Sequence, residues 1–426
     1  MSNVKKVLVI GTTADYIELL IDRFEDRVFF VTDFEERIKW KGVKPASSSE
    51  LLLDLEDHGV IVNALEGHLR EHNIVPSGVA CFDCESLALA AIIAVNFELP
   101  FPGLESVMNC RSKNLSKSIW KGHGIPCPDF ALIRDEGDAM RFFDSLNGPA
   151  VMKPLSGSGS ELVLSCKEKD DCRQAYKTII GKLQSHPNHR MYTALNMPAD
   201  ENPREVIMME QYIPGEEYSC DFILEDGCIR ILRLAKKIIN QGATFGTVSA
   251  YVLKADLPGK WDIEKLEARL QAASKSLGLN RAIAMVDFKI YDDEVFLLEI
   301  TPRPGGDCLP PLIQVSSGFD ILKAALDFAE GKQVFVPDRE QWKKVVGFPL
   351  IASQRGVLKT LDADALASDS RVVSCYFKRS MGDTIELPPE DYDSRLLGYV
   401  IFRPNFEETM EKQCLEIAQK LIIEVK

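Results

Sequence analysis

The sequence has no hydrophobic run long enough to cross a membrane. Its longest apolar stretch, Leu87–Val95, is about half of the roughly 20 residues that a transmembrane helix needs. Lys5 and Lys6 precede only the short run Val7–Ile10 before a glycine, so no signal peptide is expected. We therefore expect a soluble, cytoplasmic protein.

Common cofactor motifs are missing as well. Gly11 follows the first expected strand, but the second and third glycines of a dinucleotide fingerprint are absent. Cys81 and Cys84 form the one CxxC motif, without a second pair or a histidine at metal-ligand spacing, so neither zinc nor redox function is expected. The eleven cysteines are scattered through apolar or helical stretches, which is typical of reduced, buried thiols.

The charge balance is acidic, with 64 acidic and 50 basic residues and a net charge of −14. This balance argues against nucleic acid as the main partner. A length of 426 residues, 46% of them hydrophobic, suits a globular protein of several domains. No internal repeat is visible.

The first hundred residues alternate strands with helices, which predicts a doubly wound parallel sheet. A proline-rich linker ends this domain near residue 105. The expected strands are Lys5–Ile10, Val28–Thr32 and Gly78–Phe82, and the expected helices are Tyr16–Phe24 and Cys84–Phe97.

A predicted helix from Asn109 to about Gly122 carries Lys113 and Lys117, and a lone lysine on a helix is usually solvated. Strand Phe130–Ile133 follows. Strand Ala150–Pro154, with Lys153, then leads through a glycine–serine loop to strand Glu161–Ser165. The loop lacks the GK[ST] ending of a P-loop, but its free backbone N–H groups can wrap phosphates. A flexible hairpin turn is the alternative, and Lys153 beside the loop favours phosphate binding.

Helix Asp170–Leu183 precedes a polar segment, Gln184–Arg204, that we expect to be a mobile surface loop. Strand Glu205–Met209 ends in EQYIPGEEYSCD, residues 210–221. Backbone groups at such a strand end can pair with an adenine edge, Ile213 can cover its face, and a later carboxylate can hold ribose. Strand Cys228–Ala235 continues the sheet, and helix Asp262–Leu277 has Asp262 as its cap.

Residues 284–306 predict a hairpin that brings two acids together. Strict alternation puts Asp287 on the polar face of one strand, and it puts Leu297, Glu299 and Thr301 together on one face of the other. Asp287 and Glu299 then lie side by side, and a divalent cation between them, with Arg303 nearby for phosphate, relieves their repulsion. The alternative is an exposed hairpin with solvated acids.

The rest of the chain carries no concentrated chemistry. Helix Phe319–Glu330 is expected, followed by a small α+β domain that closes one side of the site. Its expected elements are strands Gly347–Ile351, Val372–Phe377, Thr384–Leu387 and Gly398–Phe402 and helix Phe406–Leu421.

Four motifs in this order resemble the ATP-grasp superfamily of carboxylate–amine ligases over roughly residues 1–330, and the tail is similar to the branch with bacterial L-amino-acid ligases. The motifs are NCRSKNLSKSIWKGHGIPCPDF (109–130), VMKPLSGSGS (151–160), MEQYIPGEEYSCDF (209–222) and AMVDFK with VFLLEITPRPGGD (284–307). The resemblance implies an N-terminal α/β domain (1–105), a nucleotide-binding domain (106–330, flap-bearing part about 125–205) and a C-terminal α+β domain (331–426).

The resemblance also implies roles for individual residues. ATP and Mg²⁺ or Mn²⁺ are the implied cofactors, Asp287 and Glu299 the metal ligands, and Arg303 the residue that stabilises the transferred phosphoryl group. The Gly305–Asp307 turn would line the acceptor site. The residues implied to bind ATP are Lys113, Lys153, Ser156, Gly157, Ser158, Gly159, Ser160, Glu210, Gln211, Tyr212, Ile213, Glu217 and, more loosely, Lys236.

Two positions depart from the family. Thr301 stands where Asn is frequent, and Met285 stands where D-alanine–D-alanine ligase has an arginine that Arg281 could replace. The implied reaction joins a small carboxylate to an amine through an acyl phosphate, releasing ADP and phosphate, in a protein for which a homodimer is common. A bicarbonate-activating enzyme and a non-catalytic ATP-binding protein are the alternatives, although the chain has no biotin-carrier segment.

Overall fold

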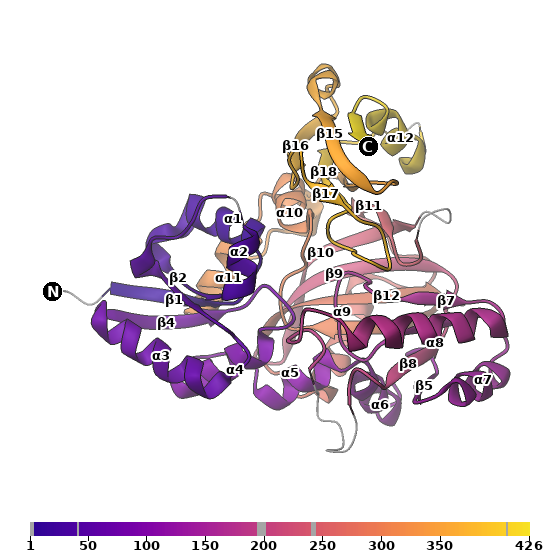
Figure 1. The fold of residues 1–426 in the computed structure, drawn as a ribbon, viewed down its shortest axis with the longest axis horizontal. Coiled ribbons are helices and arrows are strands. Elements are labelled where there is room, and N and C mark those ends of the chain that lie inside the picture. The colour runs from indigo at the N-terminus through magenta and orange to yellow at the C-terminus, as the bar shows by residue number, and fades with distance from the viewer. Residues whose placement is uncertain (1–3, 41, 194–201, 240–243, 406–407) are drawn as a thin grey trace.

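The computed structural model describes residues 4–40, 42–193, 202–239, 244–405 and 408–426. The N-terminal lobe lies at the left of Figure 1, the C-terminal lobe at the top, and a small sheet with its helices at the lower right of a large central sheet. One of the four sheets is parallel and the other three are antiparallel, which confirms the predicted mixture of α/β and α+β structure.

The N-terminal lobe is a parallel sheet with strand order β3-β2-β1-β4. Successive residues of β1 are fully buried against opposite faces, Val7 and Val9 against one core and Leu8 and Ile10 against another. This confirms the doubly wound sheet. The elements are β1 (Val4–Ile10), α1 (Ala14–Phe24), β2 (Val28–Asp33), α2 (Phe34–Lys39), β3 (Glu50–Leu53), α3 (His58–Glu71), β4 (Ile74–Ala80) and α4 (Leu87–Asn96).

Residues far along the chain complete this lobe. Helix α11 (Ile321–Ala329) packs beside α1 in the core that contains Val7 and Val9. At Gly78 of β4 a Cβ atom would lie 2.4 Å from the carbonyl oxygen of Ala329, so this contact requires glycine. The preceding helix α10 (Leu309–Ser317) was not predicted; its two prolines stand in the first turn, where a missing N–H costs nothing.

The central sheet has eight strands in the order β13-β12-β9-β10-β11-β14-β18-β16. Helix α9 (Ile263–Ser276) covers one face, and Asp262 caps it as predicted by accepting the Lys265 N–H at 2.8 Å. The strands are β9 (Glu216–Glu225), β10 (Cys228–Ile239), β11 (Val248–Leu253), β12 (Ala282–Tyr291), β13 (Glu294–Thr301), β14 (Val346–Ile351), β16 (Val372–Phe377) and β18 (Leu396–Phe402).

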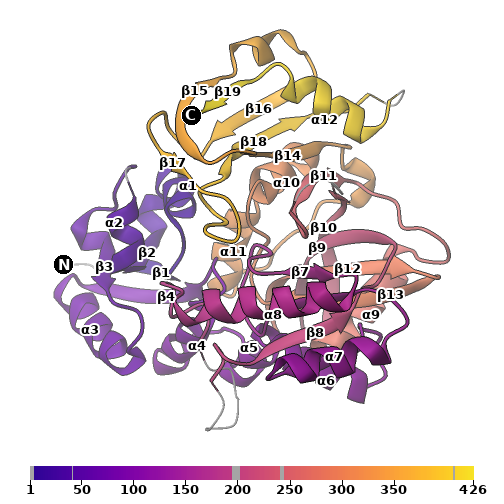
Figure 2. The same cartoon turned by 45° about the vertical axis from the view of Figure 1, so that its right-hand side comes forward.

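The small sheet has the order β5-β8-β6-β7, and Figure 2 shows α8 lying along it. Strands β6 and β7 are antiparallel and joined by the glycine–serine loop, which confirms the expected flap. The elements are β5 (Phe130–Ile133), α7 (Glu136–Ser145), β6 (Ala150–Pro154), β7 (Leu164–Cys166), α8 (Lys169–Gln184) and β8 (Ile207–Gln211).

One local prediction in this region was wrong. The single helix expected from Asn109 is two helices, α5 (Leu104–Arg111) and α6 (Lys113–Gly122), because the Ser112 hydroxyl caps α6 by accepting the Leu115 N–H at 3.2 Å. Within 184–204, residues 194–201 lie outside the described residues. In the described part, Met191 and Tyr192 are only 8% and 2% exposed and anchor the segment to the protein, while the residues around them are half-buried or exposed, as expected of a surface loop.

The C-terminal lobe is continuous with the central sheet, because β14 pairs with β11. Strands β15 (Gly356–Asp362) and β19 (Ile422–Val425) were not predicted, and β17 is Thr384–Ile385. Helix α12 is Met410–Ala418; the start expected for it, Phe406, lies outside the described residues. The domain boundaries stay predictions. Within the described ranges no helix is both long and apolar enough to cross a bilayer.

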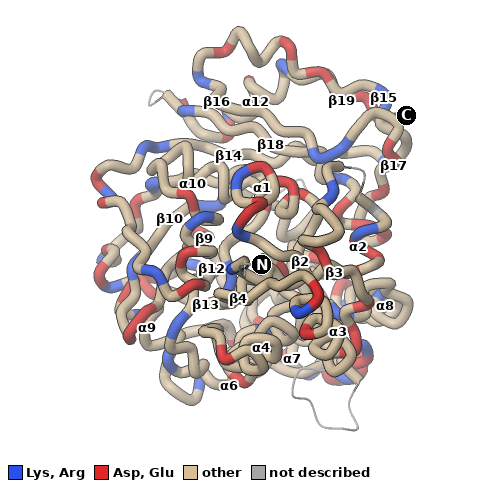
Figure 3. Tube along the Cα trace, turned by 90° about the vertical axis from the view of Figure 1, so that its left-hand side faces the viewer, with Lys and Arg blue, Asp and Glu red and all other residues tan. Residues whose placement is uncertain are grey.

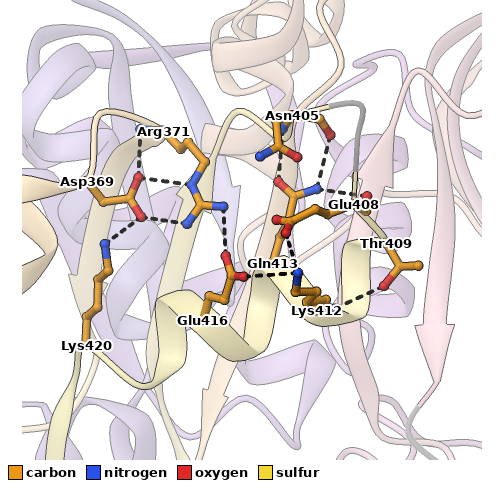
Figure 4. Close-up of polar contacts among 9 residues, drawn as sticks. All are labelled: Asp369, Arg371, Asn405, Glu408, Thr409, Lys412, Gln413, Glu416 and Lys420. Carbon is orange, nitrogen blue, oxygen red and sulfur yellow. Dashed lines mark hydrogen bonds and ion pairs between the residues drawn. The ribbon is translucent and has the colours of Figure 1, made fainter.

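A polar network fastens α12 to this lobe (Figure 4). Asp369 accepts hydrogen bonds from Arg371 at 2.8 and 3.0 Å and from Lys420 at 2.9 Å, and Arg371 also reaches Glu416 of α12 at 3.2 Å. The fully buried Gln413 donates to the carbonyl oxygens of Asn405 and Glu408, both at 3.1 Å. These bonds tie α12 to the residues just before β16 and to Asn405 and Glu408, which precede the helix.

We expect Asp369→Asn to loosen α12. The hydrogen bonds from Arg371 and Lys420 hold the pKa of Asp369 below its usual range, and losing charged hydrogen bonds typically costs about 1.5–3 kcal/mol. A depressed pKa contributes stability above the unfolded-state value, about 4, that is lost as pH falls further. Hydrogen exchange of residues 410–418 should be faster in this variant at pH 7, with the difference shrinking below about pH 4. The exposed Asp364→Asn is the control, and equal exchange in the two variants would contradict the role given to Asp369.

Candidate active site

The β12–β13 hairpin pairs Asp287 directly with Glu299, as the alternation predicted. A bulge follows, because Phe288 pairs with Leu297 and leaves Leu298 unpaired. Leu297 is therefore fully buried in the core with Ile300, and the prediction that it shares a face with Glu299 was wrong. The unpaired Leu298 carbonyl accepts a hydrogen bond from Lys117 Nζ at 2.6 Å.

Lysines meet both acids. Lys237 Nζ lies 2.7 Å from Asp287 Oδ2 and 3.0 Å from Glu217 Oε1, and Lys113 Nζ lies 3.7 Å from Glu299 Oε2. Burial raises the pKa of Asp287; Lys237 opposes the shift, while Glu299 and Glu217 add to it. Asp287 Oδ1 is buried without a hydrogen-bond partner among the described residues. The acids are thus neutralised, but one carboxylate oxygen is left for a further cation.

Glu210 is the centre of a second group of charged side chains. Its carboxylate is buried, 2.5 Å from Lys153 Nζ and 3.2 Å from Lys117 Nζ. Burial raises the pKa of Glu210, but the two lysines hold it below its usual value. Burial in turn lowers the pKa of Lys117 to about 8. The Glu210 side chain therefore positions lysines, and only its backbone can belong to an adenine site.

The strand end after β8 leaves one free amide. The N–H groups of Gln211 and Tyr212 donate to loop carbonyl oxygens at 2.7 and 2.9 Å, whereas the Ile213 N–H has no acceptor in the described ranges. The Ile213 carbonyl accepts from Lys289 Nζ at 3.0 Å, and this ammonium lies 4.5 Å from the centre of the Tyr212 ring. Ile213 is the hinge residue with an N–H available to a ligand.

The alternation of side chains along β10 shows which of two adjacent lysines faces Asp287. Lys237 contacts Asp287 and Glu217, while Lys236 points to the other face, where it pairs with Glu216 near the surface. Lys236 therefore lies outside the cluster, contrary to the resemblance-based assignment. We use "lysine–carboxylate cluster" for the set that does converge, Lys113, Lys117, Lys153, Glu210, Glu217, Lys237, Asp287, Lys289 and Glu299. Figure 3 shows basic and acidic residues interspersed along β9, β10 and β12.

The flap rests on the cluster at one end. Lys113 Nζ donates to the Gly157 carbonyl at 3.2 Å. Ser156 is 4% exposed and its hydroxyl donates to the Met191 carbonyl at 2.9 Å, so it faces away from a ligand. Gly157 and Gly159 have φ of +122° and +63°, which favour glycine. Ser158 and Ser160 are half-buried and Gly159 is exposed at the tip, so this part of the loop remains open to a ligand.

Arg303 lies at the edge of the site that faces the N-terminal lobe. Its Nε and one terminal nitrogen both lie 3.2 Å from Cys84 Sγ, and another donates to the Pro304 carbonyl at 2.6 Å. No carboxylate of the described residues forms an ion pair with it. Arg281 does not replace the arginine absent at Met285, because it pairs with Glu225 at 3.4 Å and covers the Phe328 ring.

The loop that carries Arg303 is held from two sides. Below it, the almost fully buried ion pair of Arg233 and Asp221 presents Asp221 Oδ1 to the Gly305 N–H at 2.8 Å. From the N-terminal lobe, the Tyr16 hydroxyl donates to the Gly305 carbonyl at 3.0 Å. Asp221 also stands opposite Met285 in the β9–β12 register, so a buried arginine does lie near this position, but it comes from β10.

Sequence reasoning missed several of these residues. Lys117 lies one helical turn after Lys113, a spacing that puts both on one face of a helix. Lys289 alternates with Asp287 on β12 and so shares its face. Those two signals were available in the sequence. Arg233 and Asp221 stand in otherwise apolar strands, and only their pairing shows what they do.

Comparison with known proteins gives a family match and several similar proteins. Residues 146–311 match the family described as ATP-grasp domain. A D-alanine–D-alanine ligase of Acidovorax ebreus is 26% identical over 56% of this chain and 70% of its own length. An uncharacterized protein, y4rH, of Sinorhizobium fredii is 23% identical over 72% of this chain, and the match spans 60% of that protein. The crystal structure of an L-amino acid ligase from Bacillus licheniformis has a TM-score of 0.79 at 18% identity over the whole of both chains.

The match of residues 146–311 to the ATP-grasp domain, together with a ligase among the relatives, supports the resemblance found in the sequence. The likeness to the L-amino acid ligase establishes the fold. Members of this family use ATP and generally Mg²⁺.

The lysine pair of β10 offers a test of the site. Lys237→Met leaves the largely buried carboxylates of Asp287 and Glu217, 16% and 19% exposed, without a shared cation, and breaking a buried pair costs about 3–5 kcal/mol. Lys236→Met removes a near-surface ion pair, for which we expect at most about 1 kcal/mol. Urea unfolding of both variants at pH 7 measures the difference. Equal losses of stability would show that Lys237 is not the lysine inside the cluster.

Proposed function

We propose that this protein is an ATP-dependent ligase that joins a small carboxylate to an amine through an acyl phosphate. The observation that carries the proposal is the convergence of the lysine–carboxylate cluster between flap and hairpin, with Arg303 at its edge and paired to no carboxylate of the described residues. Five lysines exceed four acids in this cluster, so the site favours an anion such as a polyphosphate.

The chain's own residues fit a bound nucleotide. Lys113 and Lys153 would meet the phosphates under Ser158–Ser160, with Lys237 in the place that the sequence assigned to Lys236. The free Ile213 N–H would pair with the adenine edge, and Glu217 would hold ribose. Glu210 and Gln211, at the end of β8, would support the bound nucleotide.

The residues also fit a divalent cation. Asp287 Oδ1 is a buried carboxylate oxygen without a partner, and Glu299 stands directly opposite on the paired strand. Carboxylate oxygens are the ligands that Mg²⁺ prefers, and such an ion neutralises phosphate charge when bound. Asp287 and Glu299 would hold it, and the Thr301 hydroxyl is an additional oxygen on the same strand.

Arg303 would act on the reacting groups. A guanidinium without an acidic partner can meet the negative oxygens that develop as phosphate transfers to the carboxylate and as the amine attacks. The clamp on Gly305 from Asp221 and Tyr16 keeps the loop in place, so this donor is pre-positioned.

Hydroxylamine trapping tests the proposal. Purified protein with ATP, Mg²⁺, hydroxylamine and each amino acid in turn should yield a hydroxamate and ADP, because hydroxylamine attacks an acyl phosphate. ADP release that depends on bicarbonate, without any hydroxamate, would instead identify a bicarbonate-activating enzyme. ATP binding without ADP release under every condition would identify a non-catalytic protein.

Arg303→Ala tests the role of the arginine. We expect turnover to fall by about 10²–10³, the usual cost of one transition-state donor, with the affinity for ATP nearly unchanged. Steady-state kinetics and nucleotide titration measure the two quantities. The control is Arg141→Ala, whose side chain is 72% exposed on α7. Normal turnover in Arg303→Ala would remove Arg303 from the mechanism.

A further inference from the structure

Among the described residues, the guanidinium of Arg303 forms hydrogen bonds to one side chain, and the acceptor is a sulfur atom. Its Nε–H and one terminal N–H both donate to Cys84 Sγ at 3.2 Å, and the other terminal nitrogen donates to the Pro304 carbonyl at 2.6 Å. An arginine side chain has five N–H donors, so one N–H on each terminal nitrogen is left over. Cys84 and Pro304 therefore hold the guanidinium and leave donors for a ligand.

The turn that carries Cys84 is itself firmly held. It follows β4, and Asp83 Oδ2 accepts the Thr12 N–H at 2.5 Å, which ties the turn to the end of β1. Asp83 Oδ1 also accepts the Ser86 N–H at 2.7 Å, and Oδ2 accepts the Ser86 hydroxyl at 3.0 Å. A Cβ atom on Gly11 would collide with both of these side chains, so they pack directly over the end of β1. The N-terminal lobe thus presents the Cys84 sulfur from a fixed turn.

Both sequence neighbours of Cys84 are acids, yet Arg303 pairs with neither of them. Asp83 uses its two carboxylate oxygens within the turn, and Glu85 Oε1 lies 3.5 Å from the amide nitrogen of Asn188. A carboxylate beside Arg303 would neutralise the guanidinium and compete with a negatively charged ligand. The position that faces the arginine is therefore occupied by a thiol, with the two acids turned to other partners.

The thiol of Cys84 carries no charge near neutral pH. Burial raises its pKa above the usual value, and Arg303 opposes this shift without cancelling it. A neutral sulfur is a weak hydrogen-bond acceptor. It can therefore orient the N–H groups of the guanidinium while the positive charge behind them stays available.

We propose that Cys84 is a positioning residue, which orients Arg303 and leaves the charge of the guanidinium for the reacting oxygens. The sulfur sets the direction of the guanidinium from the N-terminal lobe, and the free N–H groups then meet the oxygens on which negative charge develops. This inference rests on the proposed function, and it adds a residue that acts through Arg303 without touching the substrate. A thiol that only filled space would be replaceable by alanine.

Three substitutions of Cys84 separate the acceptor from its charge and its volume. Cys84→Ser keeps a neutral acceptor, Cys84→Ala removes it, and Cys84→Asp replaces it with a carboxylate that can pair with Arg303. The matched control is Cys375→Ala, because Cys375 is a half-buried thiol on β16 that packs against the core of the C-terminal lobe. Circular dichroism and the affinity for a non-hydrolysable ATP analogue show that each variant is folded.

The first measurement is hydroxamate formation with ATP, Mg²⁺, hydroxylamine and amino acids, which gives kcat and KM for each variant. We expect kcat to fall about tenfold in Cys84→Ala, because Arg303 is then less well oriented. In Cys84→Asp it should fall by about 10²–10³, as in Arg303→Ala, because the guanidinium is neutralised. Cys84→Ser and Cys375→Ala should keep kcat within about threefold. KM for ATP should change little in all four variants.

The second measurement tests the contact between Cys84 and Arg303 without turnover. Iodoacetamide reacts with the thiolate, so the alkylation rate of Cys84 as a function of pH, followed by peptide mass spectrometry, gives the pKa of this thiol. Arg303→Met should raise that pKa, because it removes the positive charge that opposes the effect of burial. The same pKa in both proteins would show that the contact is absent and would overturn the inference.

Turnover distinguishes failure of this inference from failure of the ligase proposal. Normal kcat in Cys84→Ala or Cys84→Asp, with an active unmodified protein, overturns the positioning role alone. An equal loss of kcat in Cys84→Ser and Cys84→Ala does so too, since it means that the acceptor does not matter. Absence of hydroxamate from the unmodified protein is failure of the ligase proposal, and it removes the reaction that Cys84 would serve.

Discussion

The repulsion between two facing carboxylates, those of Asp287 and Glu299, is the constraint on which the site depends. Two like charges about 5 Å apart repel by roughly 3 kcal/mol at an effective dielectric constant of about 20. The chain offsets this with lysines from α6, β6 and β10, elements that lie far apart in sequence. Folding around the hairpin therefore requires the flap sheet, the preceding helix and the central sheet to meet at one place. The lysines that offset the repulsion between Asp287 and Glu299 without a ligand would also suit a polyphosphate.

A second constraint joins this cluster to the N-terminal lobe. The loop after β13 leaves the sheet at Thr301 and is fixed at Gly305 by Asp221 from below and by Tyr16 from the opposite lobe. Arg303, in the same loop, reaches Cys84 of the N-terminal lobe. Helices α10 and α11 then continue into that lobe and complete its core. The N-terminal sheet thus cannot shift without moving Arg303 and its loop, so an otherwise separate α/β unit helps to set the position of this arginine.

Periodicity predicted the parts of the site that lie on regular strands and failed where the strands are irregular. The Asp287–Glu299 pair follows from alternation, but the bulge at Leu298 does not, because nothing in the residue types marks it. The choice between Lys236 and Lys237 needs the register of β10, which a single residue of slip would reverse. Ser112 between Arg111 and Lys113 is a cap that could have been recognised. The covering of the N-terminal sheet by α11 could not, because it is a contact between residues some 300 positions apart.

The continuous sheet fixes the position of the C-terminal lobe relative to the candidate site. Because β14 pairs with β11 and β11 with β10, the lobe is in hydrogen-bonded register with the strand that carries Lys237. A lobe attached only by a flexible linker would take variable positions, whereas this one is fixed to the central sheet. Glycine at 347 eases this approach, since a Cβ atom there would lie only 3.0 Å from Cys308 Sγ and from a methyl carbon of Leu312. The same sheet that carries Lys237 therefore also holds the C-terminal lobe against the segment that follows the Arg303 loop.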